Sequence, residues 1–441
     1  MLNFKIKNIN NIFFIFILSH LLLWTLVPTI TNKNLPLDTI EALAWGSNLD
    51  WGFSKHPPMS AFIIEIFYQL FGSQDWAYYL LSQIFVIFSF FIVFKLSKEI
   101  FENKNLSIFS VLLLEGIYYF NFTTPEFNVN ICQLPFWSLV VYFSWKIFSK
   151  KKLDLKDFVY LGIFSAFGFL SKYLFFYLLI SIFIFFCYLF YIARDRKFDF
   201  KYIISLEIFF VLLVPHIIWL FNNEFITLVY GLTRAGAEQV NIIDHLKFPL
   251  IFITKQIVIL IPFFILVKFL IKKIKFNFEL KDKKLIFLLS INIFPFILMF
   301  MTSFLFGLKI RTMWMTPFYL FLGVLAVYIL EKQINEYNLK NFLIAFIVLF
   351  FISPIAYAFV SLVDPDKRTD YKGKQIALKV QKQWNSNFED EINVVLGDEW
   401  YAGNLSYHLK SRPVWLGEID SLKLDKLNKF LCIEEVCIGN K

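Results

Sequence analysis

The chain has 441 residues, of which 58% are hydrophobic and 17% are charged, and it contains 59 phenylalanines. This composition excludes an ordinary soluble enzyme and indicates a polytopic membrane protein. The formal net charge of +9 is spread over short segments between apolar runs, which is typical of membrane topology. No nucleic acid is therefore expected as a partner.

Eleven apolar runs predict membrane-spanning helices, so the predicted fold class is an all-α polytopic membrane protein with about eleven transmembrane helices. Lysine and arginine gather in alternate connections, and with a cytoplasmic N-terminus the positive-inside rule places the other connections outside the cytoplasm. The first run lacks a small-x-small cleavage site at its exit and is expected to be retained. The predicted spans are 9–30, 76–97, 105–122, 131–149, 158–171, 173–192, 202–221, 248–271, 285–305, 314–330 and 341–363.

Two domains are predicted along the chain. Residues 1–363 form the transmembrane unit, and from residue 364 the hydropathy falls. The pattern of apolar residues in 364–441 predicts a small α/β domain outside the membrane, with its elements in the order helix, strand, helix, strand. In an oxidising compartment Cys432 and Cys437 of this outer domain could close a small disulfide loop, whereas a metal pair would need further ligands. The outer-face loops of the transmembrane unit are 31–75, 123–130, 222–247 and 306–313.

The stretch from Leu37 to Ala61 gathers acids, a lysine, a histidine and a Pro-Pro pair between two apolar runs. Within it, Asp38 and Glu41 are three residues apart, so on a helix they share a face. A carboxylate at a membrane surface can have its pKa tuned and can take a proton from an acceptor hydroxyl. The alternative is a capping box, with Asp38 as the N-cap and Glu41 at the third helical position. The two interpretations are compatible.

Lys55 and His56 form a basic pair directly before Pro57 and Pro58, where a helix is expected to start. The free N-H groups and the positive dipole end of a helix start favour an anion such as phosphate. The alternative is interfacial anchoring, with the long side chain of Lys55 reaching toward water.

The second outer connection reads NFTTPEFNVN and holds Glu126 without any basic residue. An acid this close to hydrocarbon is costly unless it has a partner or a function, the alternative being an ordinary loop turn. Lys172 and Arg311 supply positive charges on the same membrane face. The outer face is therefore predicted to bring two acids and several cations together.

Six short motifs follow one another along the chain: Asp-x-x-Glu after the first span, His-Pro-Pro before a juxtamembrane helix, LFG, TPE in the second outer loop, LSKY, and Arg-x-x-Trp near the tenth span. Together they resemble the membrane glycosyltransferases of the dolichyl-phosphate-mannose protein mannosyltransferase superfamily, which have the GT-C fold. The bacterial branch is most similar, including the lipid A aminoarabinose transferase and the lipopolysaccharide galacturonosyl transferases. The outer domain, with RTDYKGKQIA, GDEWYAGNLSYHL and RPVW, resembles the tail of some bacterial members.

This resemblance implies that Asp38 is the catalytic base and Glu126 the second acid, at a position where family members more often have Asp. His56 would contact a lipid phosphate. Lys55 stands where the family pattern has an acid, and this weakens the hypothesis that residue 55 is a metal ligand. Whether a divalent cation is needed stays open. The remaining implied substrate or phosphate contacts are Glu41, Lys172 and Arg311.

The implied function is an inverting glycosyltransferase on the periplasmic face of the bacterial inner membrane. It would move a sugar from a polyprenyl-phosphate donor to lipid A, lipopolysaccharide or another envelope acceptor, so its partners would be that donor, a lipid or glycolipid acceptor and membrane lipids. One alternative is a transporter or flippase for a lipid-linked or anionic substrate, which should show polar residues near mid-membrane in several spans. The other is a non-catalytic envelope assembly protein whose loop acids are helix caps.

Overall fold

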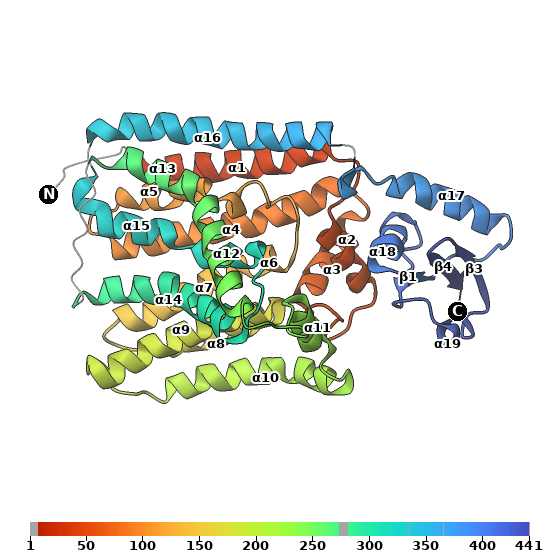
Figure 1. The fold of residues 1–441 in the computed structure, drawn as a ribbon, viewed down its shortest axis with the longest axis horizontal. Coiled ribbons are helices and arrows are strands. Elements are labelled where there is room, and N and C mark those ends of the chain that lie inside the picture. The colour runs from red at the N-terminus through yellow and green to blue at the C-terminus, as the bar shows by residue number, and fades with distance from the viewer. Residues whose placement is uncertain (1–7, 273–280, 335, 365, 441) are drawn as a thin grey trace.

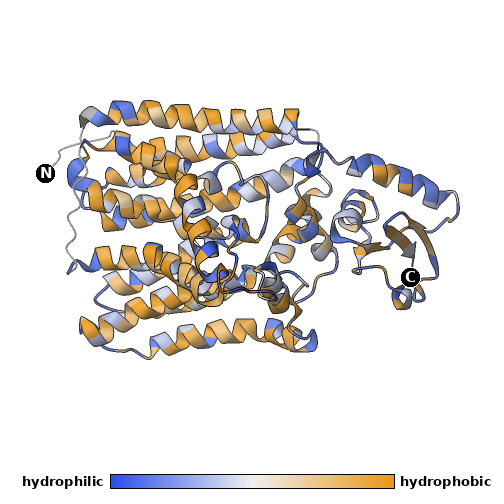
Figure 2. Cartoon of the chain, in the orientation of Figure 1, coloured by the Kyte–Doolittle hydropathy of each residue, from blue (hydrophilic) through white to orange (hydrophobic). Residues whose placement is uncertain are grey.

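The computed structural model describes residues 8–272, 281–334, 336–364 and 366–440. Its long helices form a bundle, and a small C-terminal domain of residues 366–440 lies at one end of that bundle (Figure 1). The bundle helices are predominantly hydrophobic, whereas the C-terminal domain is mixed (Figure 2). The chain is therefore a multi-pass membrane protein with a separate polar domain.

Seven helical segments of the described residues are long and apolar enough to cross a membrane. A crossing helix needs about 20 apolar residues because each residue adds about 1.5 Å to its length. The seven segments are α1 (Ile9–Thr31), α4 (Asp75–Ile100), α6 and α7 (Val129–Cys132 and Leu134–Ser149), η3, α9 and η4 (Tyr173–Phe175, Phe176–Cys187 and Tyr188–Ile192), α10 (Lys201–Asn222), α14 (Lys283–Phe306) and α16 (Glu336–Val363).

Two further spans are bent pairs of helices. The first joins α12 (Asp244–Ile259) to α13 (Ile261–Leu270) at 47°, and the second joins η5 (Thr312–Tyr319) to α15 (Leu322–Leu330) and η6 (Glu331–Gln333) at 53°. Proline lies close to each bend, in IPFFILVKFL at the start of α13 and in TMWMTPFY of η5. Its ring removes a backbone donor and breaks the helical ladder there. Counting each pair as one span gives up to nine spans among the described residues.

The other two predicted spans are helical but short. α5 (Leu106–Leu112) with η1 (Leu113–Gly116), and α8 (Leu155–Ser171), each have fewer than 18 residues. η1 ends where Gly116 packs directly on α13, because a Cβ on Gly116 would lie 2.5 Å from Phe263 Cα. All eleven predicted runs therefore contain helix, and eleven crossings stays a prediction.

The short helices α2 (Leu37–Ser47), α3 (Met59–Phe71) and α11 (Ile226–Arg234) lie at the end of the bundle that faces the C-terminal domain (Figure 1). The short helix η2 (Tyr118–Phe120) follows η1. As predicted, the Pro-Pro pair directly precedes α3, with Pro58 as its N-cap residue.

The C-terminal domain contains the predicted order of helix, strand, helix and strand, followed by an additional hairpin. Its four-stranded sheet has the order β2-β1-β4-β3, with β1 and β2 parallel and the other pairs antiparallel. Trp384, Val395 and Ile438 lie in its apolar core. The elements are η7 (Arg368–Asp370), α17 (Gly373–Asn385), β1 (Val394–Gly397), α18 (Glu399–His408), β2 (Val414–Trp415), α19 (Ser421–Leu424), β3 (Lys429–Ile433) and β4 (Val436–Asn440).

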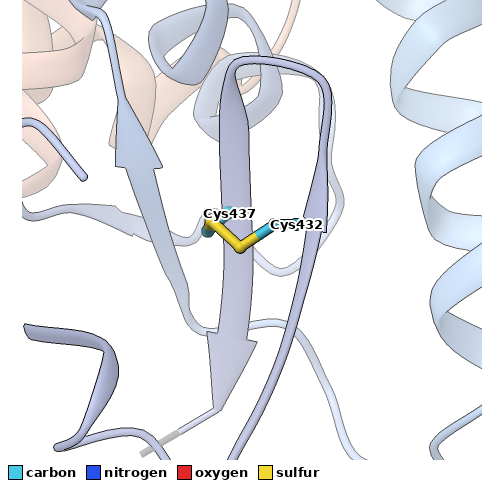
Figure 3. Close-up of a disulfide and its surroundings, with 2 residues drawn as sticks. All are labelled: Cys432 and Cys437. Carbon is cyan, nitrogen blue, oxygen red and sulfur yellow. A yellow bond between two sulfur atoms is a disulfide. The ribbon is translucent and has the colours of Figure 1, made fainter. Parts of the chain in front are cut away.

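The two cysteines of this domain form a disulfide across the β3–β4 hairpin (Figure 3). Cys432 and Cys437 are directly opposite in the strand register, with their Cα atoms 4.0 Å apart. The disulfide that was one possibility for this cysteine pair is therefore present. A disulfide of this kind is typical of an oxidising compartment.

Arg412 attaches the C-terminal domain to helices α2 and α3. Its Nη2 donates to the carbonyl oxygen of Leu43 and to Glu65 Oε2, both at 2.7 Å, and its guanidinium lies 3.9 Å from the ring centre of Tyr68. Helix α18 also packs closely on α2, where a Cβ on Gly403 would lie 3.1 Å from the Cβ of Ala44. These contacts fix the domain against the membrane unit.

Candidate functional site

A cavity of about 1320 Å³ lies between helices α2 and α11, the membrane helices and the C-terminal domain. Pockets of this kind, with a few convergent polar groups, are the usual sites for small ligands. The structure brings five of the seven predicted site residues to its wall, namely Asp38, Glu41, Lys55, His56 and Lys172.

Asp38 lies in the first turn of α2 without capping that helix. The N-cap residue is Pro36, which has no side-chain capping bond, so the capping-box interpretation of Asp38 is wrong. Instead, the carboxyl group of Glu126 reaches α2 from the loop before α6, and its Oε1 accepts a 3.0 Å hydrogen bond from the backbone N-H of Asp38. Glu126 thereby satisfies one of the free N-H groups at the start of α2 and lies beside its positive dipole end.

The proximity of Asp38 and Glu126 affects the proton affinity of both carboxyl groups. Burial, together with the negative charge of Asp38, raises the pKa of Glu126 to about 8. Burial also raises the pKa of Asp38, against the opposing charges of Lys172 and Lys55. Glu126 therefore holds a proton at neutral pH, while nearby cations favour the ionised form of Asp38.

Lys55 is held between two carboxylates. Its Nζ lies 2.9 Å from Glu41 Oε1 and forms a second ion pair with Glu399 of the C-terminal domain. Although burial disfavours the charged amine, these two acids raise the pKa of Lys55 above its ordinary value. Burial raises the pKa of Glu41 to about 7, with Lys55 opposing the shift.

Lys172 is buried at the cavity wall, with 6% of its surface exposed. Its Nζ donates a 2.5 Å hydrogen bond to Asn130 Oδ1 and lies 5.4 Å from the ring centre of Trp314. Burial lowers the pKa of Lys172 to about 7, and the charge of Asp38 opposes this shift. The amine therefore titrates near neutral pH and is sensitive to any anion that enters the cavity.

His56 carries a neutral imidazole. Burial, reinforced by the charges of Lys172 and Lys55, lowers the pKa of His56 to about 3. The ring packs edge-on against Trp45 and Tyr230, at centroid distances of 5.8 and 6.3 Å. His56 can therefore offer a phosphate a hydrogen bond but no positive charge.

The other two predicted site residues are not in the wall of this cavity. Glu126 lines a smaller neighbouring cavity of about 360 Å³, which shares Leu37, Lys367 and Arg368 with the larger one. Arg311 immediately precedes η5 and is absent from both walls. Its predicted neighbour position is therefore not realised, and its partly buried side chain has an Nε that makes no hydrogen bond within the described chain.

The sequence did not single out several residues that complete the wall. Arg234 ends α11, and Lys367 and Arg368 begin the C-terminal domain. The guanidinium of Arg368 lies 5.8 Å from the ring centre of Trp400, and its charge lowers the pKa of Asp38. A signal for Arg368 was present, since it opens the RTDYKGKQIA segment. In the described ranges, no three His, Cys, Asp or Glu side chains form a group that could hold a metal ion.

Comparison with known proteins places this geometry in a structural class. Residues 55–219 match the family model described as dolichyl-phosphate-mannose-protein mannosyltransferase. ArnT from Cupriavidus metallidurans bound to undecaprenyl phosphate has a similar structure, with a TM-score of 0.61 and 12% identity over 95% of this chain and 88% of that chain. Its apo state gives a TM-score of 0.63 and 13% identity, with the same coverage. No curated protein matches the chain.

The chain therefore has the GT-C fold, and the resemblance inferred from its motifs is confirmed. More particularly, the arrangement of a helical membrane unit with a small C-terminal strand region is ArnT-like.

Proposed function

We propose that the protein is an inverting glycosyltransferase that moves a sugar from a polyprenyl phosphate to an envelope acceptor. The observation that carries this proposal is that an acidic and a basic side chain, Asp38 and Lys172, line one cavity. The charge of each one favours the ionised form of the other, against the effect of burial. One group is suited to accept a proton, and the other to neutralise a leaving phosphate. The ArnT-like fold supports the same reaction class.

In this reaction Asp38 takes the proton of an acceptor hydroxyl while the oxygen of that hydroxyl attacks the anomeric carbon of the sugar. The bond from that carbon to the phosphate oxygen breaks, and the electron pair leaves with the polyprenyl phosphate. Lys172, Arg234 and Arg368 neutralise the charge that develops on the phosphate, and one well-placed group of this kind contributes about 3 kcal/mol to the barrier. Glu126 holds the start of α2 in place and keeps its own proton.

The donor class is proposed from the bound undecaprenyl phosphate of the ArnT structure. The membrane helices α9 and α14 contribute Tyr177, Met299 and Thr302 to the cavity wall, so a lipid chain could extend along these helices while its phosphate meets the cations. We assign the site to the periplasmic face of a bacterial inner membrane. Support comes from the positive-inside pattern and from the disulfide of the C-terminal domain at the same end of the bundle.

The acceptor is proposed to be lipid A, lipopolysaccharide or another envelope glycolipid. Mass spectrometry of envelope lipids from a deletion strain and its parent tests this, because the missing mass identifies both the sugar and the acceptor class. The mass should return with the wild-type chain and stay absent with Asp38→Asn. Return of the mass with a chain carrying both Asp38→Ala and Glu126→Ala would instead favour a non-catalytic assembly protein. Transport of labelled substrate into vesicles without covalent transfer would favour a carrier.

A further inference from the structure

Glu399 lies at the contact between the C-terminal domain and the outer loops. It begins α18, is 6% exposed, and uses both carboxylate oxygens. Oε1 accepts hydrogen bonds from Trp45 Nε1 at 3.1 Å and from Ser54 Oγ at 3.3 Å, while Oε2 forms the ion pair with Lys55. A buried carboxylate with three partners is held in a single position, because each contact fixes a different direction.

The partners of Glu399 belong to the elements that form the cavity. Trp45 is on α2, the helix that carries Asp38 and Glu41, and Lys55 lines the cavity from the following loop. Lysine has a flexible four-carbon stem, so one ion pair alone leaves its ammonium group free to move. With Glu41 on one side and Glu399 on the other, the ammonium is confined.

We propose that Glu399 is a positioning residue, through which the C-terminal domain holds Lys55 at the cavity and fixes helix α2. Its role in transfer rests on the proposed function, whereas its hold on Lys55 does not. Without the side chain of Glu399, Lys55 pairs with Glu41 alone and α2 loses the hydrogen bond that Trp45 donates. Through the intact contact of Glu399 with Lys55, the C-terminal domain acts as a part of the site.

The pH dependence of the site should follow the same contact. Glu399 raises the pKa of Glu41, and it competes with Glu41 for Lys55. Removing its charge should therefore lower the pKa of Glu41 below about 7. The other charged or titratable groups that face this cluster are Asp38, His56, Lys172, Asp398 and Glu418.

The test in transfer is a double-mutant cycle on the full chain in liposomes. Glu399→Gln keeps the size of the side chain and an oxygen acceptor for Trp45, and it should lower kcat/KM about tenfold. Combined with Lys55→Gln it should lower kcat/KM no further than Lys55→Gln alone, and the part of the pH profile that reports the titration of Glu41 should move to lower pH. The matched control is Glu389→Gln, an exposed acid of the same domain. Additive losses, with an unshifted pH profile, would overturn the inference.

A second readout does not depend on transfer. In the wild-type chain, an amine-reactive reagent should label Lys55 slowly, because the two carboxylates favour its protonated form, and Lys33, which is 70% exposed, serves as the reference. Glu399→Gln should increase the labelling rate of Lys55 several-fold without changing that of Lys33. If Glu399→Gln is not recovered folded, Glu399→Asp should show a smaller increase, since it keeps the charge on a shorter stem.

Unchanged labelling of Lys55 in these variants would overturn the contact that the inference rests on. Faster labelling of Lys55 in a chain that transfers no sugar would support the contact while overturning the proposed function.

Discussion

Lys172 provides a prediction in which pH is the perturbation and binding of a lipid phosphate is the readout. The amine is buried beside Asn130 and Trp314, and burial lowers its pKa to about 7. Below that pH the side chain is an ammonium ion that attracts phosphate, and above it the side chain is a neutral amine. Affinity for an anionic lipid should therefore fall as the pH rises through 7.

The magnitude follows from the protonated fraction of Lys172. With a pKa of about 7, about nine-tenths of the molecules carry the charge at pH 6, and about one-tenth carry it at pH 8. When only the protonated form is competent, the apparent dissociation constant is the intrinsic one divided by that fraction. The expected weakening between pH 6 and pH 8 is about tenfold, or ~1.4 kcal/mol.

Equilibrium binding of undecaprenyl phosphate to the protein in lipid nanodiscs measures this effect. Lys172→Arg keeps its charge at every pH, so it should bind at both pH values and report only the ionisation of the lipid phosphate itself. Lys172→Met should bind weakly at both. The reasoning would be refuted if wild type and Lys172→Arg had the same pH dependence, or if Lys172→Met bound as tightly as wild type.

Three further predictions concern the base, the domain contact and the disulfide. Asp38→Asn should reduce transfer by about 10²- to 10⁴-fold while donor binding is retained, which turnover and equilibrium binding measured on one preparation will separate. Arg412→Ala leaves the carboxylate of Glu65 without its ion-pair partner and should destabilise the docked C-terminal domain by about 3 kcal/mol, measured as faster limited proteolysis, with retained resistance arguing against the contact. Replacing Cys432 and Cys437 together by serine should lower the stability of the domain by about 2 kcal/mol, the expectation for a short loop, and an unchanged denaturant midpoint would count against this.

The sequence predicted the helices and the cavity acids because both depend on local patterns. Long apolar runs are visible without knowledge of tertiary structure, and alternating basic segments predict on which side of the membrane each connection lies. This sidedness was enough to expect Asp38, Lys55 and Lys172 at one membrane face. All three do line one cavity.

Other features depend on contacts between distant segments, which no local pattern reveals. Glu399 meets Lys55 across 344 positions of the chain, and nothing in its neighbourhood marks it as an ion-pair partner. Arg311 was expected at the site because its connection is predicted to lie on the same membrane side as Asp38. The membrane side does not decide which way a side chain points, and Arg311 does not line the cavity. The capping role given to Asp38 was wrong because Glu126, 88 positions away, occupies the start of α2.

The central claim is that Asp38 drives sugar transfer from a lipid phosphate. The most direct measurement reconstitutes the purified protein with a panel of labelled polyprenyl-phosphate sugars and lipid A, and follows by mass spectrometry the glycosylated acceptor and the released polyprenyl phosphate. With one donor, wild type should form both products in equal amounts, and Asp38→Asn should form both at a rate lower by about 10²- to 10⁴-fold. Full transfer by Asp38→Asn, or a wild-type chain that binds these donors and transfers none of them, would contradict the account.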